Sequence, residues 1–231
     1  MTNTKLPMLD AASLSKAEDT LTRSRLGKYL RVTRNNLQQA LRLYVLNAKV
    51  SAAVMTDLHY IEIAMRNRFD RELTNQYGIS WFNNTQFLNL LNEMTRRILL
   101  KAQRNAEKHW PKGIPLPPGK IIAELTFGFW LRLTDSKLEH TLWVPCLHKA
   151  FSPNKAPKRA TFNQQLEKLR QLRNRVAHHE PIFHLDLLDT CRRIHDVAKL
   201  LCPTTARVMR QTSTVKRQVM KLNKYRQLRG I

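Results

Sequence analysis

Helix-breaking residues are concentrated in a few short stretches of this chain, and their distribution constrains the fold more than any other feature of the sequence. The chain has only six glycines and ten prolines among 231 residues, and the stretch WPKGIPLPPGK, residues 110–120, holds four of those prolines and two of those glycines. Leu, Ala, Arg, Gln and Lys dominate the long segments, and they favour helix over sheet. The sequence therefore predicts an all-α protein, with residues 110–120 as its clearest internal loop.

Apolar residues recur at helical spacing through most of the chain. We expect one helix over 26–50 and a second over 51–77, with Ser51 as the N-cap of the second and Gly78 as its end. A loop is also expected at SPNKAPK, residues 152–158. Further helices are expected over 85–109, 121–133, 136–150 (interrupted by Pro145), 160–177 and 185–201 (ended before Pro203).

These patterns predict three consecutive regions. Residues 1–23 are weakly patterned and form either a flexible lead or a short peripheral helix. Residues 24–202 form the helical domain, and 42% apolar residues overall provide enough side chains for a sizeable core. Residues 203–231 form a basic C-terminal segment.

The charge balance of the chain points to a polyanionic partner. Forty Lys and Arg stand against 17 Asp and Glu, a formal net charge of +23, and no acidic residue follows Asp196. Nucleic acid is the leading candidate, because neutralising phosphates releases counterions and gives strong, salt-sensitive attraction. A solvated basic tail without a specific partner is the alternative. The expected RNA-binding residues of the C-terminal segment are Arg207, Arg210, Lys216, Arg217, Lys221, Lys224, Arg226 and Arg229.

Other common functional classes find little support in the sequence. No apolar run reaches the roughly 18 residues of a membrane span, and the N-terminus MTNTKLPMLD lacks an apolar signal stretch, so we expect a cytoplasmic protein without a membrane partner. The three cysteines show no Cys-x-x-Cys spacing, and the histidines form no His-Glu-x-x-His set. We therefore expect no disulfide framework, no metal site and no cofactor.

The expected helix over 160–177 carries a charge where its pattern calls for an apolar residue. Phe162, Leu166, Leu169 and Val176 trace one stripe, and Arg173 falls on it, directed toward the core side, where an unpaired charge costs several kcal/mol. Asn174 and His178, four residues apart, share a neighbouring face. Pro181 cannot continue the helix, so the helix should end around His178 and His179, and that ending would let His178 approach Arg173.

The expected helix over 51–77 shows a similar irregularity. Glu62 and Arg66 lie four residues apart on its apolar face, as a possible i, i+4 pair, and would lie near Arg173 and His178 if the two apolar stripes meet in one bundle. Each feature also has a purely structural explanation. Histidines near a helix C-terminus complement the helix dipole, and Arg66 and Arg173 are natural ion-pair partners for Glu62.

The segment RNRVAHHEP resembles the Arg-x4-6-His signature of HEPN ribonucleases, in the form found in the Abi-like (AbiD/AbiF) abortive-infection proteins. Three further blocks are similar to the same family in the same order. They are ALRLYVLNAKVSAAVMTDLHYIEIAMRNRFDREL followed by YGISWF, then FGFWLRLTD, then LWVPCLHKAF. The resemblance spans roughly residues 26–200, and the ordered set of blocks is far more specific than the short motif alone.

The resemblance implies a HEPN-type helical bundle with additional helices and a basic C-terminal extension, which forms a homodimer whose two Arg-x4-His segments meet in a cleft. Arg173 matches the motif arginine, Asn174 the polar residue after it, and His178 the motif histidine. His179 satisfies the looser spacing, so the choice between the two histidines stays open. Glu62 and Arg66 match a recurrent Glu-x3-Arg with a supporting role.

The implied activity is metal-independent RNA cleavage of the toxin or phage-defence type. RNA carries its own nucleophile, the 2′-hydroxyl, so His178 would transfer protons and Arg173 would stabilise the phosphorane-like transition state. The expected products carry a 2′,3′-cyclic phosphate and a 5′-hydroxyl. Members of the AbiF branch are associated with a structured noncoding RNA, so the resemblance implies such an RNA as a further partner, whose effect, restraining or guiding the enzyme, stays open.

Two other functions remain open from the sequence. The first is a non-catalytic protein that holds a structured noncoding RNA on a HEPN scaffold, for which the large positive charge is well suited. The second, a DNA-binding regulator, ranks lower because the long helices contain no convincing helix-turn-helix.

Overall fold

The computed structural model describes residues 8–151 and 155–231, and within them every regular element is a helix. The expected all-α class is confirmed. The expected loop at 152–158 falls partly on residues outside this description. The elements are α1 (Ala11–Leu21), α2 (Arg23–Val32), α3 (Leu37–Tyr77), η1 (Trp81–Asn83), α4 (Thr85–Leu90), α5 (Glu93–Lys108), α6 (Pro118–Glu124), α7 (Phe127–Arg132), η2 (Ser136–Leu138), η3 (Glu139–Trp143), η4 (Leu147–Ala150), α8 (Arg159–Ala177), α9 (Leu187–Leu201), α10 (Pro203–Thr212) and α11 (Val215–Arg229).

The chain folds into two compact units, each assembled from segments that are far apart in sequence. Unit one comprises Met1–Thr56, Arg173–Cys191 and Ser213–Ile231, and unit two comprises Asp57–Leu172 and Arg192–Thr212. The regions expected from the sequence were consecutive, whereas α3, α8 and α9 each contribute residues to both units. The N-terminal lead contains the short helix α1, one of its two expected forms, with Asp10 accepting a hydrogen bond from the Ser13 amide.

The first two expected helices are wrong in their boundaries. The break falls at residues 33–36, where Arg34 and Asn35 have φ angles of 52° and 61°, and α3 then runs without interruption from Leu37 to Tyr77. Ser51 lies within α3 and is not an N-cap. The physical reason is that residues 37–77 contain neither glycine nor proline, and a serine inside a helix costs only a few tenths of a kcal/mol.

Three other expected helices are divided into shorter ones. The helix expected over 85–109 is two helices, because Asn92 caps α5 by accepting a hydrogen bond from the Thr95 amide at 2.9 Å. The segment 121–133 forms α6 and α7, and 136–150 forms only the short turns η2, η3 and η4. The proline-rich stretch is a loop as expected, except that Pro118 occupies the first turn of α6, where its missing amide is no loss.

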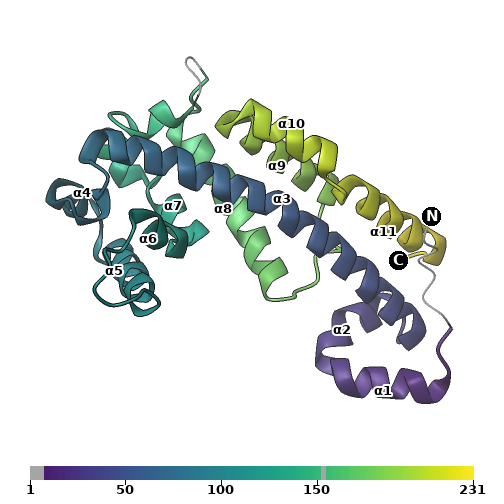
Figure 1. The fold of residues 1–231 in the computed structure, drawn as a ribbon. Helices are drawn as coiled ribbons and strands as arrows, with labels where there is room; N and C mark the ends of the chain where they lie inside the picture. Colours follow the sequence, from purple (N-terminus) through teal and green to yellow (C-terminus); the bar gives the residue numbers. More distant parts are fainter. Residues whose placement is uncertain (1–7, 152–154) are drawn as a thin grey trace. The chain divides into compact units, whose positions relative to one another are not determined.

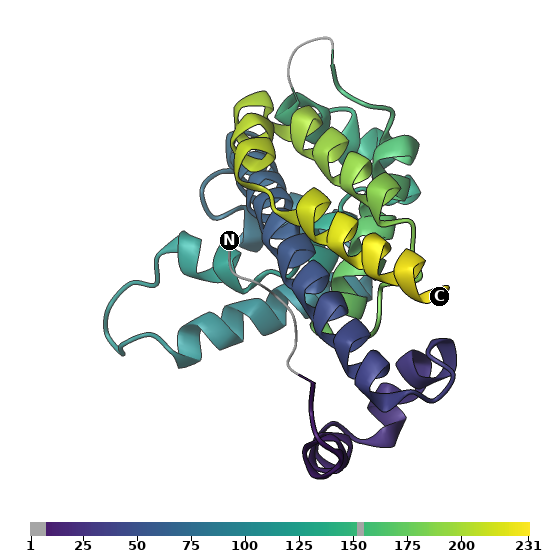
Figure 2. The same ribbon diagram turned by 90° about the vertical axis from the view of Figure 1, so that its right-hand side faces the viewer.

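Unit one is held together by aromatic packing and by α11. Tyr29 of α2 packs on Tyr44 of α3 and on Phe183, with ring centroids 5.4 and 5.2 Å apart. Figures 1 and 2 show α11 lying beside the N-terminal part of α3, and the Tyr225 hydroxyl donates to the Gln39 carbonyl at 3.1 Å. Because α11 buries Val215, Val219 and Leu222, it is part of the folded core rather than a solvated tail.

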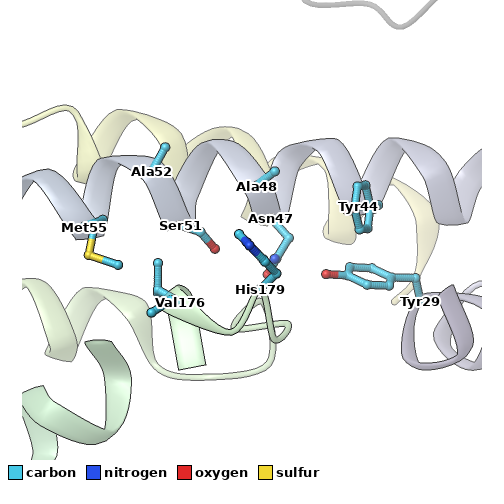
Figure 3. Close-up of a pocket in the computed structure, with 10 residues that line it drawn as sticks. Tyr29, Tyr44, Asn47, Ala48, Ser51, Ala52, Met55, Val176 and His179 are labelled. Carbon is cyan, nitrogen blue, oxygen red and sulfur yellow. The ribbon is translucent and has the colours of Figure 1, made fainter. Parts of the chain in front are cut away.

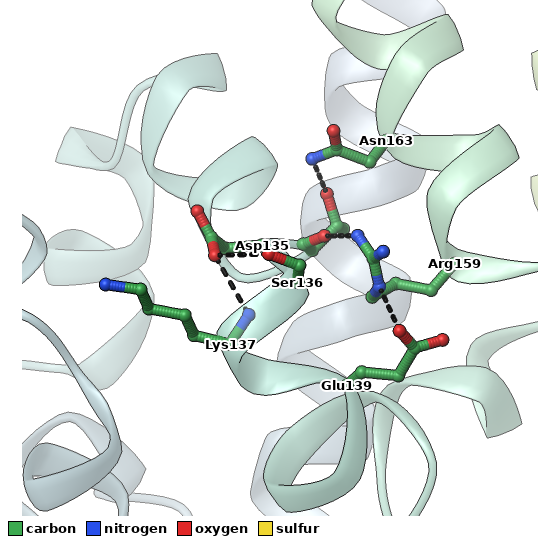
Figure 4. Close-up of polar contacts among 7 residues, drawn as sticks. Asp135, Ser136, Lys137, Glu139, Arg159 and Asn163 are labelled. Atoms are coloured by element: carbon green, nitrogen blue, oxygen red, sulfur yellow. Dashed lines mark hydrogen bonds and ion pairs between the residues drawn. The ribbon is translucent and has the colours of Figure 1, made fainter.

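Unit two contains a salt bridge whose arginine is almost completely buried. Arg159, 9% exposed, pairs with Glu139 at 3.0 Å and donates to the Thr134 carbonyl at 2.9 Å, as Figure 4 shows for the contact with Glu139. Asn163, one turn further along α8, donates to the Thr134 hydroxyl at 2.8 Å. This network fixes the start of α8 against the segment of short turns, and thus fixes one end of the helix that carries the candidate site.

In the described chain, no helix is both long and apolar enough to cross a membrane.

Candidate active site

The candidate site is built on the C-terminal end of α8. Phe162, Leu166, Leu169 and Val176 are buried along one face of this helix, which confirms the expected apolar stripe. The helix ends at Ala177, so the two histidines lie just beyond it, also as expected. The candidate residues at this end all belong to unit one: Arg173, Asn174, His178 and His179.

The helix ending has a specific geometry that places the two histidines differently. The His179 amide donates to the Val176 carbonyl at 3.0 Å, and the Glu180 amide donates to the Arg175 carbonyl at 2.8 Å. This pair of bonds is a Schellman motif, in which the residue at the position of His179 adopts the left-handed conformation. Its φ is 57°, a region that favours glycine, yet a histidine occupies it. The backbone therefore reverses at His179, whereas the His178 amide still makes a helical hydrogen bond to the Asn174 carbonyl.

Arg25 of α2 completes the helix ending from across unit one. Its guanidinium Nη1 donates to the carbonyl of His179 at 3.0 Å and, more weakly, to that of His178 at 3.4 Å. These carbonyls have no intrahelical partner, and a cation near the negative end of the helix dipole is favourable. Arg25 thus positions the histidine pair. Sequence patterns did not identify it, because 153 residues separate it from His178.

Asn47 of α3 anchors the chain immediately after the site. Its side chain is 5% exposed, and Oδ1 accepts hydrogen bonds from the amides of Ile182 at 2.8 Å and Phe183 at 3.0 Å. Asn47 was also missed by the sequence analysis, although a signal exists. It lies between the buried Leu43 and Val50 at helical spacing, so a polar residue interrupts an apolar stripe there.

Arg173 differs from its expected environment. The expectation was a guanidinium directed toward the core, but the residue is only partly buried. The long aliphatic part of an arginine can cover apolar surface while its charged end reaches water, which explains a charged residue on an apolar stripe. Within the described chain, the Arg173 side chain forms no hydrogen bond and no ion pair, so its charge is available to an anionic ligand. Asn174 is also partly buried, and its carbonyl accepts the His178 amide at 2.9 Å.

Both histidine side chains are exposed to solvent. His178 and His179 make no side-chain hydrogen bond to any described residue, so neither ring is committed to a structural role. The neighbouring Arg175 and Glu180 form a weak surface ion pair at 4.0 Å, which does not involve either histidine.

Glu62 and Arg66 belong to unit two, in the part of α3 that follows Thr56. No ion pair joins them within 4.0 Å among the residues described, and the Arg66 Nε instead donates to Asn67 Oδ1 at 3.3 Å. The expected i, i+4 pairing is therefore not formed. Their proximity to Arg173 and His178, and their supporting role, stay predictions.

A pocket of about 330 Å³ lies directly against the last turn of α8. Figure 3 shows His179 between α3 and Tyr29, with Ser51 and Met55 further along α3. Burial, and the neighbouring Tyr44, raise the pKa of Tyr29, whose side chain is almost completely buried at this end of the pocket. Ser51, expected as an N-cap, instead contributes a hydroxyl to this pocket.

The surroundings of the site are positively charged. Burial lowers the pKa of His184, and the nearby charges of Arg175, Lys28 and Arg226 lower it further. Arg226 also donates to the Phe183 carbonyl at 3.1 Å and so ties α11 to the segment after the two histidines. No cluster of three or more His, Cys, Asp or Glu that could hold a metal ion occurs in the described part of the chain.

The residues expected to bind RNA lie on two helices in different units. Arg207 and Arg210 are exposed on α10 in unit two. On α11 in unit one, Arg226 is partly buried and bonded to the Phe183 carbonyl. The other five expected RNA-binding residues of this helix are exposed: Lys216, Arg217, Lys221, Lys224 and Arg229. The five exposed basic side chains of α11 therefore extend into solvent from a packed helix.

The sequence was compared with protein families, with curated proteins and with solved structures. Searches of curated proteins and of solved structures return no match. The profile of a family described as Abi-like protein matches residues 18–184, which include α2 to α8 and both histidines of the candidate site. Because the match covers most of the chain, the chain belongs to the Abi-like protein family.

Proposed function

We propose that this protein is a metal-independent endoribonuclease of the abortive-infection type, which acts in phage defence. Membership of the Abi-like family supports the biological role. One observation supports the activity. The end of α8 presents an exposed His178 and a partly exposed Arg173 that has no partner among the residues the structure describes, and Arg25 of α2 holds this terminus. An uncommitted cation and an uncommitted imidazole are the two groups that metal-free RNA cleavage requires.

The proposed reaction uses the 2′-hydroxyl of the RNA as nucleophile. His178 takes the proton from this hydroxyl as it attacks the adjacent phosphorus, and the protonated imidazole gives that proton to the 5′-oxygen as the bond from phosphorus to this oxygen breaks. Arg173 binds two of the phosphate oxygens and stabilises the charge that develops on them. Asn174, on the same helical turn, orients the phosphate or the imidazole. The HEPN classification, a homodimer with two such segments in one cleft, and a cytoplasmic location are parts of the same proposal.

Three experiments on the full chain test this activity. Wild-type protein should cleave single-stranded RNA in the presence of a chelator and should leave DNA of the same sequence intact. Arg173→Ala and His178→Ala should each lower the cleavage rate by at least about a hundredfold, in the range of a lost proton-transfer or charge-stabilising group. Matched controls are Arg97→Ala and His109→Ala, which remove exposed side chains of unit two and should leave the rate unchanged.

A chelator that abolishes cleavage, or DNA that is cut as fast as RNA, would contradict this chemistry. Equal rates for wild type, Arg173→Ala and His178→Ala would locate the activity elsewhere. Control variants as slow as the site variants would show that the loss is not specific to this site.

The second candidate is a non-catalytic protein that holds a structured noncoding RNA. The exposed basic side chains of α10 and α11 favour it, because a small active site requires far less positive charge. A restraining RNA would also be compatible with the enzyme. Two measurements separate the enzyme from the binding protein. The RNA that co-purifies with the protein is sequenced, and cleavage is assayed after that RNA has been removed in high salt. Stripped protein that binds RNA tightly but never cleaves it would favour the binding function.

A further inference from the structure

We infer that the pocket beside the last turn of α8 binds one base of the RNA, and that His179 is a base-recognition residue rather than the proton-transfer residue. This inference rests on the proposed function only in taking RNA as the ligand. It also separates the roles of the two adjacent histidines, which the sequence left open.

The position of the pocket is the first argument. Val176, Ala177 and His179 line it, and these residues are adjacent to Arg173 and His178 in the chain. All of its lining residues belong to unit one. A phosphate held by Arg173 would therefore have one of its two neighbouring nucleosides close to this pocket.

The size and walls of the pocket suit a flat ring. Its volume of about 330 Å³ is at the lower end of ordinary small-molecule sites. On the α3 side, Ala48 and Ala52 have small side chains that leave the space open. The partly exposed ring of Tyr44 closes one end and packs edge-on against the buried Tyr29, with an interplanar angle of 69°. Aromatic and small apolar walls provide stacking surface, the main source of affinity for an unpaired base.

The polar groups of the pocket suit a base edge. Figure 3 shows the Ser51 hydroxyl and the Tyr29 hydroxyl on either side of the His179 ring. The side chains of Ser51 and His179 have no hydrogen-bond partner among the residues described, so both are free for a ligand. A nucleobase offers donors and acceptors along one edge, which matches a hydroxyl and an imidazole placed on one wall.

The backbone conformation of His179 also indicates a role for its side chain. Its φ of 57° is unfavourable for a residue with a side chain, and glycine is the usual occupant of this position in such a helix ending. A histidine here places an imidazole in the pocket at the expense of backbone strain. Strain of this kind is often found where a side chain has a functional role.

The charge around the pocket favours a nucleotide over an apolar partner. Arg25 bonds the carbonyl of His179, and the positive charges of Arg175 and Lys28 reach His184, five residues after His179. Phosphates on either side of a bound base would lie in this positive field.

The test measures binding to uncleavable DNA oligomers, so it does not depend on catalysis. Fluorescence anisotropy gives the affinity of the full chain for short single strands of adenine, cytosine or thymine and for an abasic strand of equal length. Wild type should bind at least one base-bearing strand at least about fivefold more tightly than the abasic strand, as expected for one stacked base. Ala52→Leu, which fills the pocket, and His179→Gly, which removes the imidazole, should each abolish most of this preference.

The matched control is Thr56→Leu, one turn further along α3, exposed and outside the pocket. It should retain the full preference, and all three variants should bind the abasic strand as wild type does. Equal binding of wild type to base-bearing and abasic strands would overturn the inference. A second outcome would also overturn the inference. If Ala52→Leu kept the preference for base-bearing strands but changed the oligomeric mass measured by light scattering, the pocket would be occupied by a second copy of the chain. If base preference is lost as expected while RNA is never cleaved, the proposed enzyme fails and the pocket assignment stands.

Discussion

Replacing Asn47 with leucine tests whether one buried amide holds the segment that follows the two histidines. Leucine has nearly the same volume, so the main change is the loss of Oδ1, which accepts hydrogen bonds at 2.8 and 3.0 Å from the amides of Ile182 and Phe183. Each buried amide left without a partner costs about 1–3 kcal/mol. Asn47 borders the pocket, where water can satisfy part of this loss, so we expect a decrease of about 2–3 kcal/mol in the free energy of unfolding.

Urea unfolding followed by far-ultraviolet circular dichroism measures this decrease. With an m-value of about 2–3 kcal/mol per molar urea, the unfolding midpoint should fall by about 1 M. Asn223→Leu, at an exposed position of α11, makes the same substitution where no hydrogen bond is lost and should change the stability by less than about 0.5 kcal/mol. If Asn47→Leu destabilises the protein no more than Asn223→Leu does, the two amides do not depend on Asn47 and the reasoning is wrong.

Three further predictions concern other charged or strained residues. Arg159→Ala should lower the free energy of unfolding by about 3 kcal/mol in urea titrations, because it removes a 9% exposed guanidinium that pairs with Glu139; a loss below about 1 kcal/mol would contradict this. His179→Gly should raise the free energy of unfolding by about 1 kcal/mol, because glycine adopts a φ of 57° without strain; a lower melting temperature than wild type would contradict it. Burial, and charges including Arg175, lower the pKa of His184, so the folded state binds its proton less readily than the unfolded state does. The free energy of unfolding should therefore fall as the pH decreases from about 6.5 through the lowered pKa of His184. His184→Gln should lose less stability over this range. Identical pH profiles of wild type and variant would show that His184 is not the cause.

The sequence predicted the helical class and the end of α8 because both depend on local patterns. The stripe of Phe162, Leu166, Leu169 and Val176 is a property of one helix, and Pro181 requires the helix to stop before it. The family profile over residues 18–184 confirms the Abi-like family that was inferred from four sequence blocks.

Helix boundaries were predicted less well because capping residues are ambiguous. Ser51 and Asn92 are both good N-caps by type, but only Asn92 forms a cap, whereas Ser51 lies inside a helix. Asn92 follows Leu91, whose backbone is extended, and only the folded chain shows this break. Local sequence therefore gives candidate caps, and the surrounding packing decides between them.

The residues that position the site could not be predicted from local patterns. Arg25 lies 153 residues before His178, and Asn47 lies 135 residues before Ile182. Such contacts depend on tertiary structure, which brings α2, α3 and the end of α8 together in unit one. For Arg173, a helical wheel gives the direction of the side chain but not its degree of burial, and the residue is only partly buried.

The chemical ends of the RNA products test the proposed activity most directly. Wild-type protein is incubated with a defined RNA in chelator, and the fragments are identified by mass spectrometry, alongside the same RNA with one 2′-hydroxyl replaced by hydrogen at the cleaved linkage. Attack by the 2′-hydroxyl, assisted by His178 and Arg173, predicts a 2′,3′-cyclic phosphate on one fragment, a 5′-hydroxyl on the other, and no cleavage at the 2′-deoxy position. Fragments with 3′-hydroxyl and 5′-phosphate ends, or cleavage at the 2′-deoxy position, would contradict the account.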